Sequence, residues 1–301
     1  MDKVLILGIN GFIGRHFQNY IVEKNLISDF SFTGVDKTEP DKFTGIKYKK
    51  IDLLDYSSFQ ELILEESPDY IINLTGTFNS ENFELMEDIN VGISRSIFKI
   101  LLKKGVRIKN ILLIGSAAEY GLNNNLPINE YEPLNPINPY GFSKSMQTLY
   151  ALFYFNNFGI NVNIARTFNL VGKDISTSLS IGSFANQIKK AQNGDTIYVG
   201  NLNTKRDFLN VEDAISAFWK ILINEKKGEI YNVCSGRSYF IKDILNFLIE
   251  KSKKKLNVSV KKEYIKTSDT MDSYGDNAKL RKDTGWREEN NIFTALKEML
   301  E

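Results

Sequence analysis

The order of apolar segments constrains the fold of this 301-residue chain more than any other feature. Strand-like runs at 4–7 and 31–36 enclose a helical stretch at 11–23, which together make a βαβ unit. Strands that alternate with helices pair in parallel through right-handed crossovers, so the sequence predicts an α/β fold with a Rossmann-type doubly wound parallel sheet. Further strands are expected at 48–51, 70–74, 111–114 and 160–166, and helices near 56–66, 85–104 and 141–158.

The alternation is less regular after residue 167. We expect a helix at 181–193, a strand at 196–199, a helix at 211–223, a strand at 229–233 and a helix at 241–253. The predicted sheet domain comprises residues 1–166 with about 210–235. The remaining segments, 167–209 and 236–301, are expected to form a smaller C-terminal lobe over the carboxyl edge of the sheet, where ligands of such sheets bind.

Composition excludes several classes of function. The 38 basic and 37 acidic residues leave a net charge of +1, which gives no overall field to attract nucleic acid. A single cysteine, Cys234, and a single histidine, His16, argue against a disulfide framework or a zinc site, and we expect no metal. The apolar run at 4–7 is too short for a signal peptide or a membrane span. We therefore expect a cytoplasmic protein that binds neither nucleic acid nor a membrane.

A glycine-rich turn joins the first expected strand to the first expected helix. Its sequence runs from Gly8 through Gly11, Phe12 and Ile13 to Gly14, in a G-x-x-G-x-x-G spacing. Glycines allow a tight turn and let the backbone N–H groups of a helix N-terminus approach a pyrophosphate. The spacing alone also fits an ordinary turn, but its place directly after a strand favours a dinucleotide site.

Asp36 ends the second expected strand, 22 residues beyond Gly14. A carboxylate here can accept hydrogen bonds from the adenosine ribose and would repel a 2′-phosphate, which favours NAD(H) as cofactor. The nearby cations Arg15 and Lys37 leave NADP(H) open. Segments after the third and fourth strands are expected to line the adenine and the middle of the dinucleotide, through Asp52, Leu53, Leu74, Thr75 and Gly76.

Tyr140 and Lys144 are four residues apart and therefore share one face of a helix. The ordinary pKa of tyrosine is about 10, so a tyrosine that exchanges protons near neutrality needs a cation beside it. Ser116, at the end of a strand, could hydrogen-bond the same substrate oxygen, and Asn90 could hold a proton-relay water. A lone Tyr–Lys pair is more often a surface pair, but this combination downstream of a glycine turn favours a redox site.

These residues, with the segment 116–121, resemble the extended short-chain dehydrogenase/reductase family. Segments 166–172, 199–213, 231–236, 275–280 and 284–286 are similar to GDP-4-keto-6-deoxy-D-mannose reductases, so the resemblance extends over nearly the entire chain. It implies that Ser116, Tyr140 and Lys144 form a catalytic triad supported by Asn90, and that Tyr140 and Lys144 also contact the cofactor. It further implies that 1–166 with 210–235 bind NAD(P), and that 167–209 and 236–301 bind a nucleotide sugar.

The resemblance also implies contacts to the substrate. Asn169 and Arg206 match the positions that hold its pyrophosphate, a group suited to a guanidinium fork. Arg206 could instead form an ion pair with Asp213. Thr77, Ser116 and Ala117 are expected beside the sugar.

The residue that makes a second phosphate contact differs from the family pattern. The reductases often carry an Arg-Pro pair where this chain has Lys266-Thr267, so this contact passes to Lys266 or to Arg281.

Two alanines after the candidate catalytic serine restrict the class of reaction that the sequence predicts. Dehydratases of nucleotide sugars place an Asp-Glu pair after the catalytic hydroxyl, whereas this chain has Ala117 and Ala118, which argues against elimination of water. The resemblance therefore implies NAD(P)-dependent redox chemistry at C4 of a nucleotide sugar, with reduction of a GDP-4-keto-6-deoxyhexose for surface polysaccharide as the leading hypothesis. The alternatives are a GDP-hexose or GDP-heptose C4 dehydrogenase with tightly bound NAD, a 4-epimerase, and an NAD(P)-sensing binding protein. The intact triad argues against the sensor.

Aromatic residues recur at helical spacing at Tyr150, Phe153, Tyr154 and Phe158. Core packing explains such a stripe most simply. Together with the expected helix at 85–104, it could also form the four-helix seam of a homodimer, the assembly we expect by resemblance.

Overall fold

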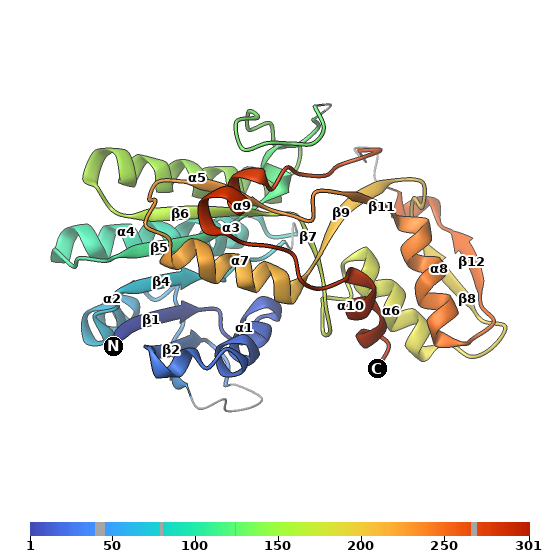
Figure 1. Ribbon diagram of the computed structural model, residues 1–301, viewed down its shortest axis with the longest axis horizontal. Coiled ribbons are helices and arrows are strands. Elements are labelled where there is room, and N and C mark those ends of the chain that lie inside the picture. Colours follow the sequence, from blue (N-terminus) through green and yellow to red (C-terminus); the bar gives the residue numbers. More distant parts are fainter. Residues whose placement is uncertain (40–45, 79–80, 124, 266–269) are drawn as a thin grey trace.

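The computed structural model describes residues 1–39, 46–78, 81–123, 125–265 and 270–301. Within them, seven parallel strands form the main sheet, in the order β10-β6-β5-β4-β1-β2-β3 (Figure 1). The predicted doubly wound parallel sheet is thereby confirmed. Its strands are β1 (Asp2–Leu7), β2 (Phe30–Asp36), β3 (Lys47–Lys50), β4 (Tyr70–Asn73), β5 (Asn110–Ser116), β6 (Val162–Thr167) and β10 (Ile230–Val233).

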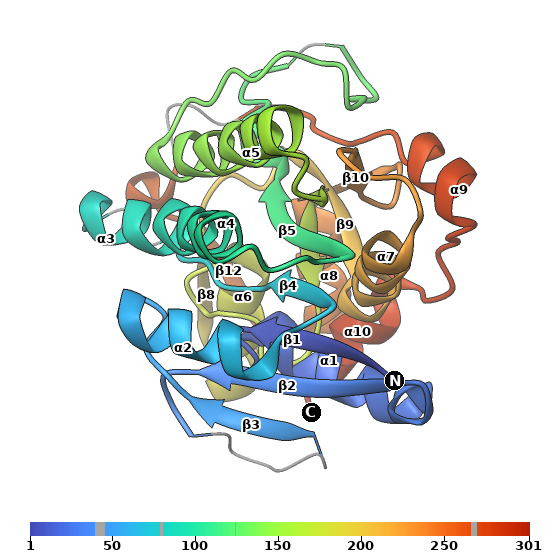
Figure 2. The same ribbon diagram turned by 90° about the vertical axis from the view of Figure 1, so that its left-hand side faces the viewer.

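Helices cover both faces of this sheet (Figure 2). One face carries α2 (Tyr56–Glu66), α4 (Ile93–Lys104) and α5 (Pro139–Phe158), and the other carries α1 (Phe12–Glu23) and α7 (Val211–Ile223). The first helix begins one residue later than expected, because Gly11 is its extended N-cap. The expected helix at 85–104 is divided into α3 (Phe83–Glu87), a π-helical turn η2 (Asp88–Gly92) and α4.

The second half of the chain adds two small sheets and several helices. A three-stranded sheet has the order β11 (Ser238–Phe240), β9 (Lys205–Asn210), β7 (Asn169–Val171), and β12 (Asn257–Val260) pairs with β8 (Thr196–Val199). Figure 1 shows β8 and β12 beside α6 (Ser180–Lys190), α8 (Ile241–Ser252) and α10 (Ile292–Glu298), at one end of the molecule. A further helix, α9 (Ala278–Thr284), packs against α7 and β10. The division into cofactor and substrate domains at the predicted boundaries stays a prediction.

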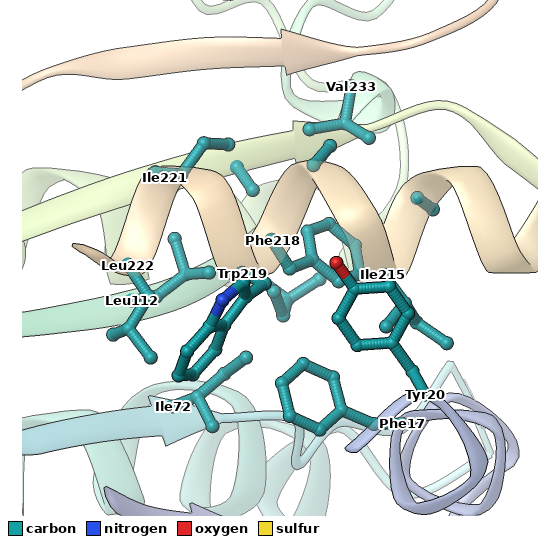
Figure 3. Close-up of a cluster of buried hydrophobic side chains, with 14 of the residues drawn as sticks. Phe17, Tyr20, Ile72, Leu112, Ile215, Phe218, Trp219, Ile221, Leu222 and Val233 are labelled. Atoms are coloured by element: carbon teal, nitrogen blue, oxygen red, sulfur yellow. The ribbon is translucent and has the colours of Figure 1, made fainter. Parts of the chain in front are cut away.

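The core between the sheet, α1 and α7 is rich in aromatic side chains (Figure 3). Trp219 and Phe218 of α7 are buried, together with Phe17 of α1. The Trp219 ring meets Phe30 edge to face at 4.8 Å between centroids. Burial of each such side chain contributes about 1.5–3 kcal/mol, so α7 is an integral part of the sheet core although it follows β9 in the sequence.

Among the residues described, no helix is both long and apolar enough to cross a membrane. The cytoplasmic location stays a prediction.

Candidate active site

The predicted cofactor residues, together with Ser116, lie where the parallel strands end. In the strand order, β1 lies between β2 and β4, so the direction of winding reverses between β1 and β4. Ligands of open α/β sheets bind at such a reversal. Gly8 follows β1 and Thr75 follows β4, and a Cβ atom on Gly8 would lie 3.0 Å from the Thr75 nitrogen. The two turns are therefore in close contact only because Gly8 has no side chain.

The glycine turn directs the N-terminus of α1 toward this edge. Gly8 has φ +80°, in the left-handed region that favours glycine. A Cβ atom on Gly14 would lie 2.3 Å from the Ile9 carbonyl oxygen, so α1 packs on the turn after β1 more closely than another residue would allow. Phe12 and Ile13 begin the helix and pack against the core. The first N–H groups of a helix have no partner within it, so the N-terminus of α1, with its dipole, fits a pyrophosphate.

The carboxylate of Asp36 is held against the same turn. It accepts hydrogen bonds from the backbone nitrogen of Asn10 at 3.1 Å and from that of Lys37 at 2.8 Å. The Arg15 guanidinium donates to the Asn10 carbonyl at 2.8 Å. Asp36 is therefore held beside the glycine turn, and its contact with the adenosine ribose stays a prediction. The Arg15 guanidinium is already engaged with the backbone.

The turn after β4 is held in place by Asn73, the last residue of the strand, which is fully buried. Its Oδ1 accepts hydrogen bonds from the backbone nitrogen of Thr75 at 3.1 Å and from the Thr75 hydroxyl at 2.5 Å. A Cβ atom on Gly76 would lie 3.4 Å from both Lys144 Nζ and Asn90 Oδ1, so this turn also adjoins the predicted catalytic group. The other expected cofactor residues near this edge are the exposed Asp52, the buried Leu53 and the partly buried Leu74.

Asn90 lies in the π-helical turn and is fully buried. Its Oδ1 accepts from the Thr77 nitrogen, and its Nδ2 donates to the Thr77 carbonyl and to Ser143 Oγ, each at 2.9 Å. Both amide hydrogens are thus used within the protein. In this arrangement Asn90 positions Thr77 against α5, and a relay water could bind only through the remaining lone pair of Oδ1.

Close packing brings Tyr140 to Ser116. Ser116 ends β5, and its hydroxyl is close enough to the Tyr140 phenol to lower the pKa of that phenol. Helix α5 starts at the N-cap Asn138, whose Oδ1 accepts from the Gly141 nitrogen at 2.8 Å. A Cβ atom on Gly141 would lie 2.4 Å from the Ala118 carbonyl oxygen, so only glycine allows the helix to approach the turn after Ser116 this closely.

Lys144 is buried one helical turn beyond Tyr140. Its ammonium donates to the Ile114 carbonyl at 2.9 Å and to Gln147 Oε1 at 3.3 Å. Burial lowers the pKa of Lys144 to about 8, against the opposing effect of Glu119. Burial raises the pKa of Tyr140, so its phenol is protonated at neutral pH and able to donate. The group can therefore supply a proton to an oxygen at this edge.

Asn169 and Arg206 lie on the paired strands β7 and β9. Asn169 Nδ2 donates to the Asp207 carbonyl at 2.9 Å. Arg206 Nη1 donates to the carbonyls of Lys205 at 2.7 Å and Thr270 at 2.6 Å. Two backbone carbonyls therefore orient the Arg206 guanidinium.

Asp213, the alternative partner of Arg206, is engaged elsewhere. Its carboxylate accepts hydrogen bonds from the backbone nitrogens of Glu289 and Asn290 at 3.1 and 2.9 Å, and from the Asn290 side chain at 2.9 Å. Its described contacts therefore assign it to the loop before α10.

The remaining predicted substrate contacts differ in position. Ala117 follows Ser116 directly and is partly exposed. Lys266 lies outside the described residues. Arg281 is exposed on α9, a helix packed on α7 and β10, whereas Asn169 and Arg206 belong to β7 and β9. A phosphate contact by Lys266 or Arg281 stays a prediction.

Comparison with protein families matches residues 4–234 to the "NAD dependent epimerase/dehydratase family". The chain belongs to this family. The match covers the glycine turn, the three triad residues and both β7 and β9, which confirms the resemblance inferred from the sequence motifs.

Individual members of the epimerase/dehydratase family align with almost the whole chain. GDP-6-deoxy-D-mannose reductase of Pseudomonas aeruginosa is 29% identical over 99% of this chain and 96% of its own length. GDP-6-deoxy-D-talose 4-dehydrogenase of Aggregatibacter actinomycetemcomitans is 25% identical over 99% of this chain and 96% of its own. UDP-glucose 4-epimerase of Lactobacillus helveticus is 28% identical over 81% of this chain and 79% of its own.

A solved structure of RMD from Pseudomonas aeruginosa, complexed with NADPH, superposes with a TM-score of 0.84. It is 27% identical and the alignment covers 100% of this chain and 98% of that one. With the family match, this identifies the protein as an NAD(P)-dependent oxidoreductase of the nucleotide-sugar reductase, epimerase and dehydratase type.

Two buried carboxylates of this family member had no role in the sequence analysis. Asp207 accepts hydrogen bonds from the backbone nitrogens of Ser235, Gly236 and Gly275 at 2.8, 3.1 and 3.3 Å, and burial raises its pKa to about 6. It joins three segments far apart in sequence, a relation that no local pattern signals. Glu119, by contrast, had a signal, because Ser116 and Glu119 form the S-x-x-E pattern of a capping box, which the structure contains.

Proposed function

We propose that this protein reduces the 4-keto group of a GDP-4-keto-6-deoxyhexose. Hydride is added to C4, and the phenolic proton of Tyr140 passes to the C4 oxygen, which yields a 4-hydroxyl. The observation that carries this proposal is the proximity of Ser116 and Tyr140, which the close approach of Gly141 to the turn after Ser116 produces. The buried Lys144 ammonium donates to the Ile114 carbonyl at the same strand edge. Alanines at 117 and 118 supply no acid or base for loss of water.

The cofactor supplies the hydride when it is bound. The glycine turn and the N-terminus of α1 would hold its pyrophosphate, and Asp36 its adenosine ribose. Ser116 and Tyr140 would hold the substrate oxygen, and the Lys144 ammonium would stabilise the phenolate that remains after proton transfer. Asn169 and Arg206 would bind the substrate pyrophosphate.

The same triad can act in the opposite direction, so oxidation of a GDP-sugar 4-hydroxyl is the second candidate. The similarity to GDP-6-deoxy-D-talose 4-dehydrogenase over nearly full length favours it as the runner-up. The GDP-linked relatives at 29% and 25% identity support GDP as the nucleotide. A part in surface polysaccharide synthesis stays a prediction.

Deuteride-labelled cofactor distinguishes these reactions. With a GDP-4-keto-6-deoxyhexose, a reductase leaves one deuterium at C4, which mass spectrometry and nuclear magnetic resonance detect. A dehydrogenase is indicated if the keto sugar is inert and a GDP-hexose or GDP-heptose reduces NAD(P) instead. An epimerase is indicated if a GDP-sugar with a 4-hydroxyl is inverted at C4 and the cofactor is left unchanged at the end of the reaction.

Asp36 should make NADH bind more tightly than NADPH, by on the order of tenfold, because a 2′-phosphate would approach a carboxylate of like charge. Fluorescence titration of both reduced cofactors measures this difference. Asp36→Asn should reduce the difference between the NADH and NADPH dissociation constants. Glu39→Gln, which alters a neighbouring exposed carboxylate, should leave that difference unchanged. Equal affinities in the parent protein would show that Arg15 or Lys37 dominates.

Arg206→Ala should weaken the binding of GDP by about 10- to 100-fold and leave NAD(P) affinity unchanged. A hydrogen bond to a charged group contributes about 1.5–3 kcal/mol, and the predicted contact is to the pyrophosphate. Calorimetry with GDP alone provides the measurement. Lys205→Ala removes the adjacent cation and should bind GDP like the parent. Parent-like affinity in the Arg206 variant would assign this guanidinium to a structural role.

The aromatic stripe on α5 divides between core and surface. Tyr154 is buried and stacks on Phe98 at 4.8 Å, while Phe153 and Phe158 are 52% and 46% exposed. Leu149, at 57% exposed, precedes Phe153 by one turn on the same face. We propose that this face covers its counterpart on a second copy in a two-fold homodimer. Light scattering should give a dimer mass for the parent and a monomer mass for Phe153→Glu.

A further inference from the structure

The carboxylate of Glu119 is fully buried directly below the triad and connects three elements. Its Oε1 accepts a hydrogen bond from the Ser116 backbone nitrogen at 2.8 Å. Its Oε2 accepts from the Thr148 hydroxyl at 2.8 Å and from Arg166 Nε at 3.0 Å. Ser116 ends β5, Thr148 lies on α5 one turn beyond Lys144, and Arg166 lies on β6. One side chain thus spans the two elements that carry the triad.

The surroundings of Glu119 fit an ionised carboxylate. All three hydrogen-bonding neighbours donate to it, and the Arg166 guanidinium, only 3% exposed, balances its charge. Arg166 in turn lies 4.7 Å from the centre of the Tyr120 ring and approaches the Glu130 carbonyl. Burial raises the pKa of Glu119, and Arg166 with the hydrogen-bond donors opposes that rise. Gly115 leaves the necessary space, since a Cβ atom there would lie 2.6 Å from Oε1.

We propose that Glu119 is a positioning residue of the reaction: it aligns Ser116 with Tyr140 and Lys144, and its charge adjusts the pH range in which they work. The proposal rests on the proposed function, in which Tyr140 donates the proton. This role differs from support of the fold. A residue that only stabilises the fold would affect the free energy of unfolding without affecting proton transfer.

The charge of Glu119 acts on both proton-handling groups. Besides burial, the influences on Tyr140 are the Ser116 hydroxyl, which lowers its pKa, and Glu119, which raises it. Glu119 likewise raises the pKa of Lys144, which otherwise contacts only the uncharged Ile114 carbonyl and Gln147 among its described hydrogen bonds. Neutralising Glu119 should therefore lower the pKa of Tyr140 and of Lys144 together, on the order of one unit.

Two variants and one control distinguish this positioning role from a purely structural role of Glu119. Glu119→Gln removes the charge and keeps the shape, but it leaves Arg166 buried without a counter-charge, which is destabilising. The double variant Glu119→Gln with Arg166→Gln removes both charges. Asp213→Asn alters another buried carboxylate, one that holds the loop at 289–290 and lies outside the site.

The measurements are kcat and KM as functions of pH, thermal unfolding, and the ultraviolet difference absorbance of the Tyr140 phenolate in cofactor-bound protein, with Tyr140→Phe as the blank. In Glu119→Gln the alkaline limb and the phenolate titration should move down by about one pH unit. The double variant should show a smaller shift in the same direction, because the opposing charge of Arg166 is removed as well. We expect kcat to fall by about 10- to 100-fold with KM within about threefold, because misalignment acts on the reacting geometry. The double variant should regain part of the lost melting temperature, and Asp213→Asn should lose stability without a shift of the profile.

An unchanged pH profile and a parent-like phenolate titration in both folded Glu119 variants would overturn the inference. If neither variant accumulates as folded protein, Thr148→Val decides. It removes one hydrogen bond to the carboxylate, and a parent-like kcat would then count against the proposal, whereas a fall of about three- to tenfold at constant KM would support it. Failure of the parent to reduce the keto sugar would reject the proposed function alone, because the phenolate titration needs no substrate.

Discussion

Replacement of Tyr140 by phenylalanine should lower kcat for reduction of the keto sugar by ~10² to 10⁴-fold, the usual contribution of a general acid. The ring and its packing remain, so the dissociation constant of the cofactor should stay within about threefold of the parent value. Steady-state oxidation of reduced cofactor and fluorescence titration measure the two quantities.

Tyr154→Phe is the matched control for this variant. It removes a hydroxyl from the same helix, at a buried position stacked on Phe98, and should turn over like the parent. Near-normal turnover in Tyr140→Phe would reject Tyr140 as the proton donor and, with it, the proposed mechanism.

Replacement of Lys144 by methionine should reduce both turnover and cofactor binding. The Lys144 ammonium is proposed to stabilise the Tyr140 phenolate, so kcat should again fall by ~10² to 10⁴-fold. The resemblance also implies that this lysine contacts the cofactor, so cofactor affinity should fall at least about tenfold, as loss of a charged hydrogen bond implies. Lys227→Met, which removes another partly buried lysine, should preserve both. Unchanged cofactor affinity in the Lys144 variant would reject the second role.

The depressed pKa of Lys144 predicts the shape of the pH profile. Its pKa is about 8, so the ammonium is present below this pH and is lost as the pH rises through it. Tyr140 keeps its proton over this range because its pKa is raised. For the reduction, kcat/KM should therefore be level below pH 8 and fall about tenfold per unit well above it. A profile that is level to pH 10 would show that Lys144 stays charged.

The sequence predicted the main sheet because its strands follow from short-range patterns, whereas the catalytic role of Ser116, Tyr140 and Lys144 stays a prediction made by resemblance. Apolar runs alternate with helical periodicity up to residue 166, and strand ends of a parallel sheet share one edge. Ser116 and Tyr140 could therefore be placed together from a strand end and a helix start. The observed strands β3 and β6 differ from the expected ranges by only one or two residues.

The features that were missed depend on partners distant in sequence. Strand β11 has three residues and pairs antiparallel with β9, with Ser238 opposite Asp207, so neither segment is recognisable alone. The π-helical turn that carries Asn90 has no distinct composition, and it interrupts an otherwise regular helical pattern. The burial of Asp207 is explained only by backbone nitrogens contributed by residues 235, 236 and 275.

Helix α7 and strand β10 are synthesised more than 40 residues after β6, so the sheet domain stays incomplete during translation of the intervening segment. A nascent polypeptide that has emerged as far as Thr167 contains every strand of the main sheet except β10. Its β6 edge is then unpaired, and the apolar face around Ile72 and Leu112, which α7 covers in the finished protein, is bare. Unpaired edges and exposed apolar faces invite aggregation. Because β7, α6, β8 and β9 precede α7 in the chain, all four must be synthesised before α7 can cover this face. The risk of aggregation is therefore greatest while residues 168–210 are being added.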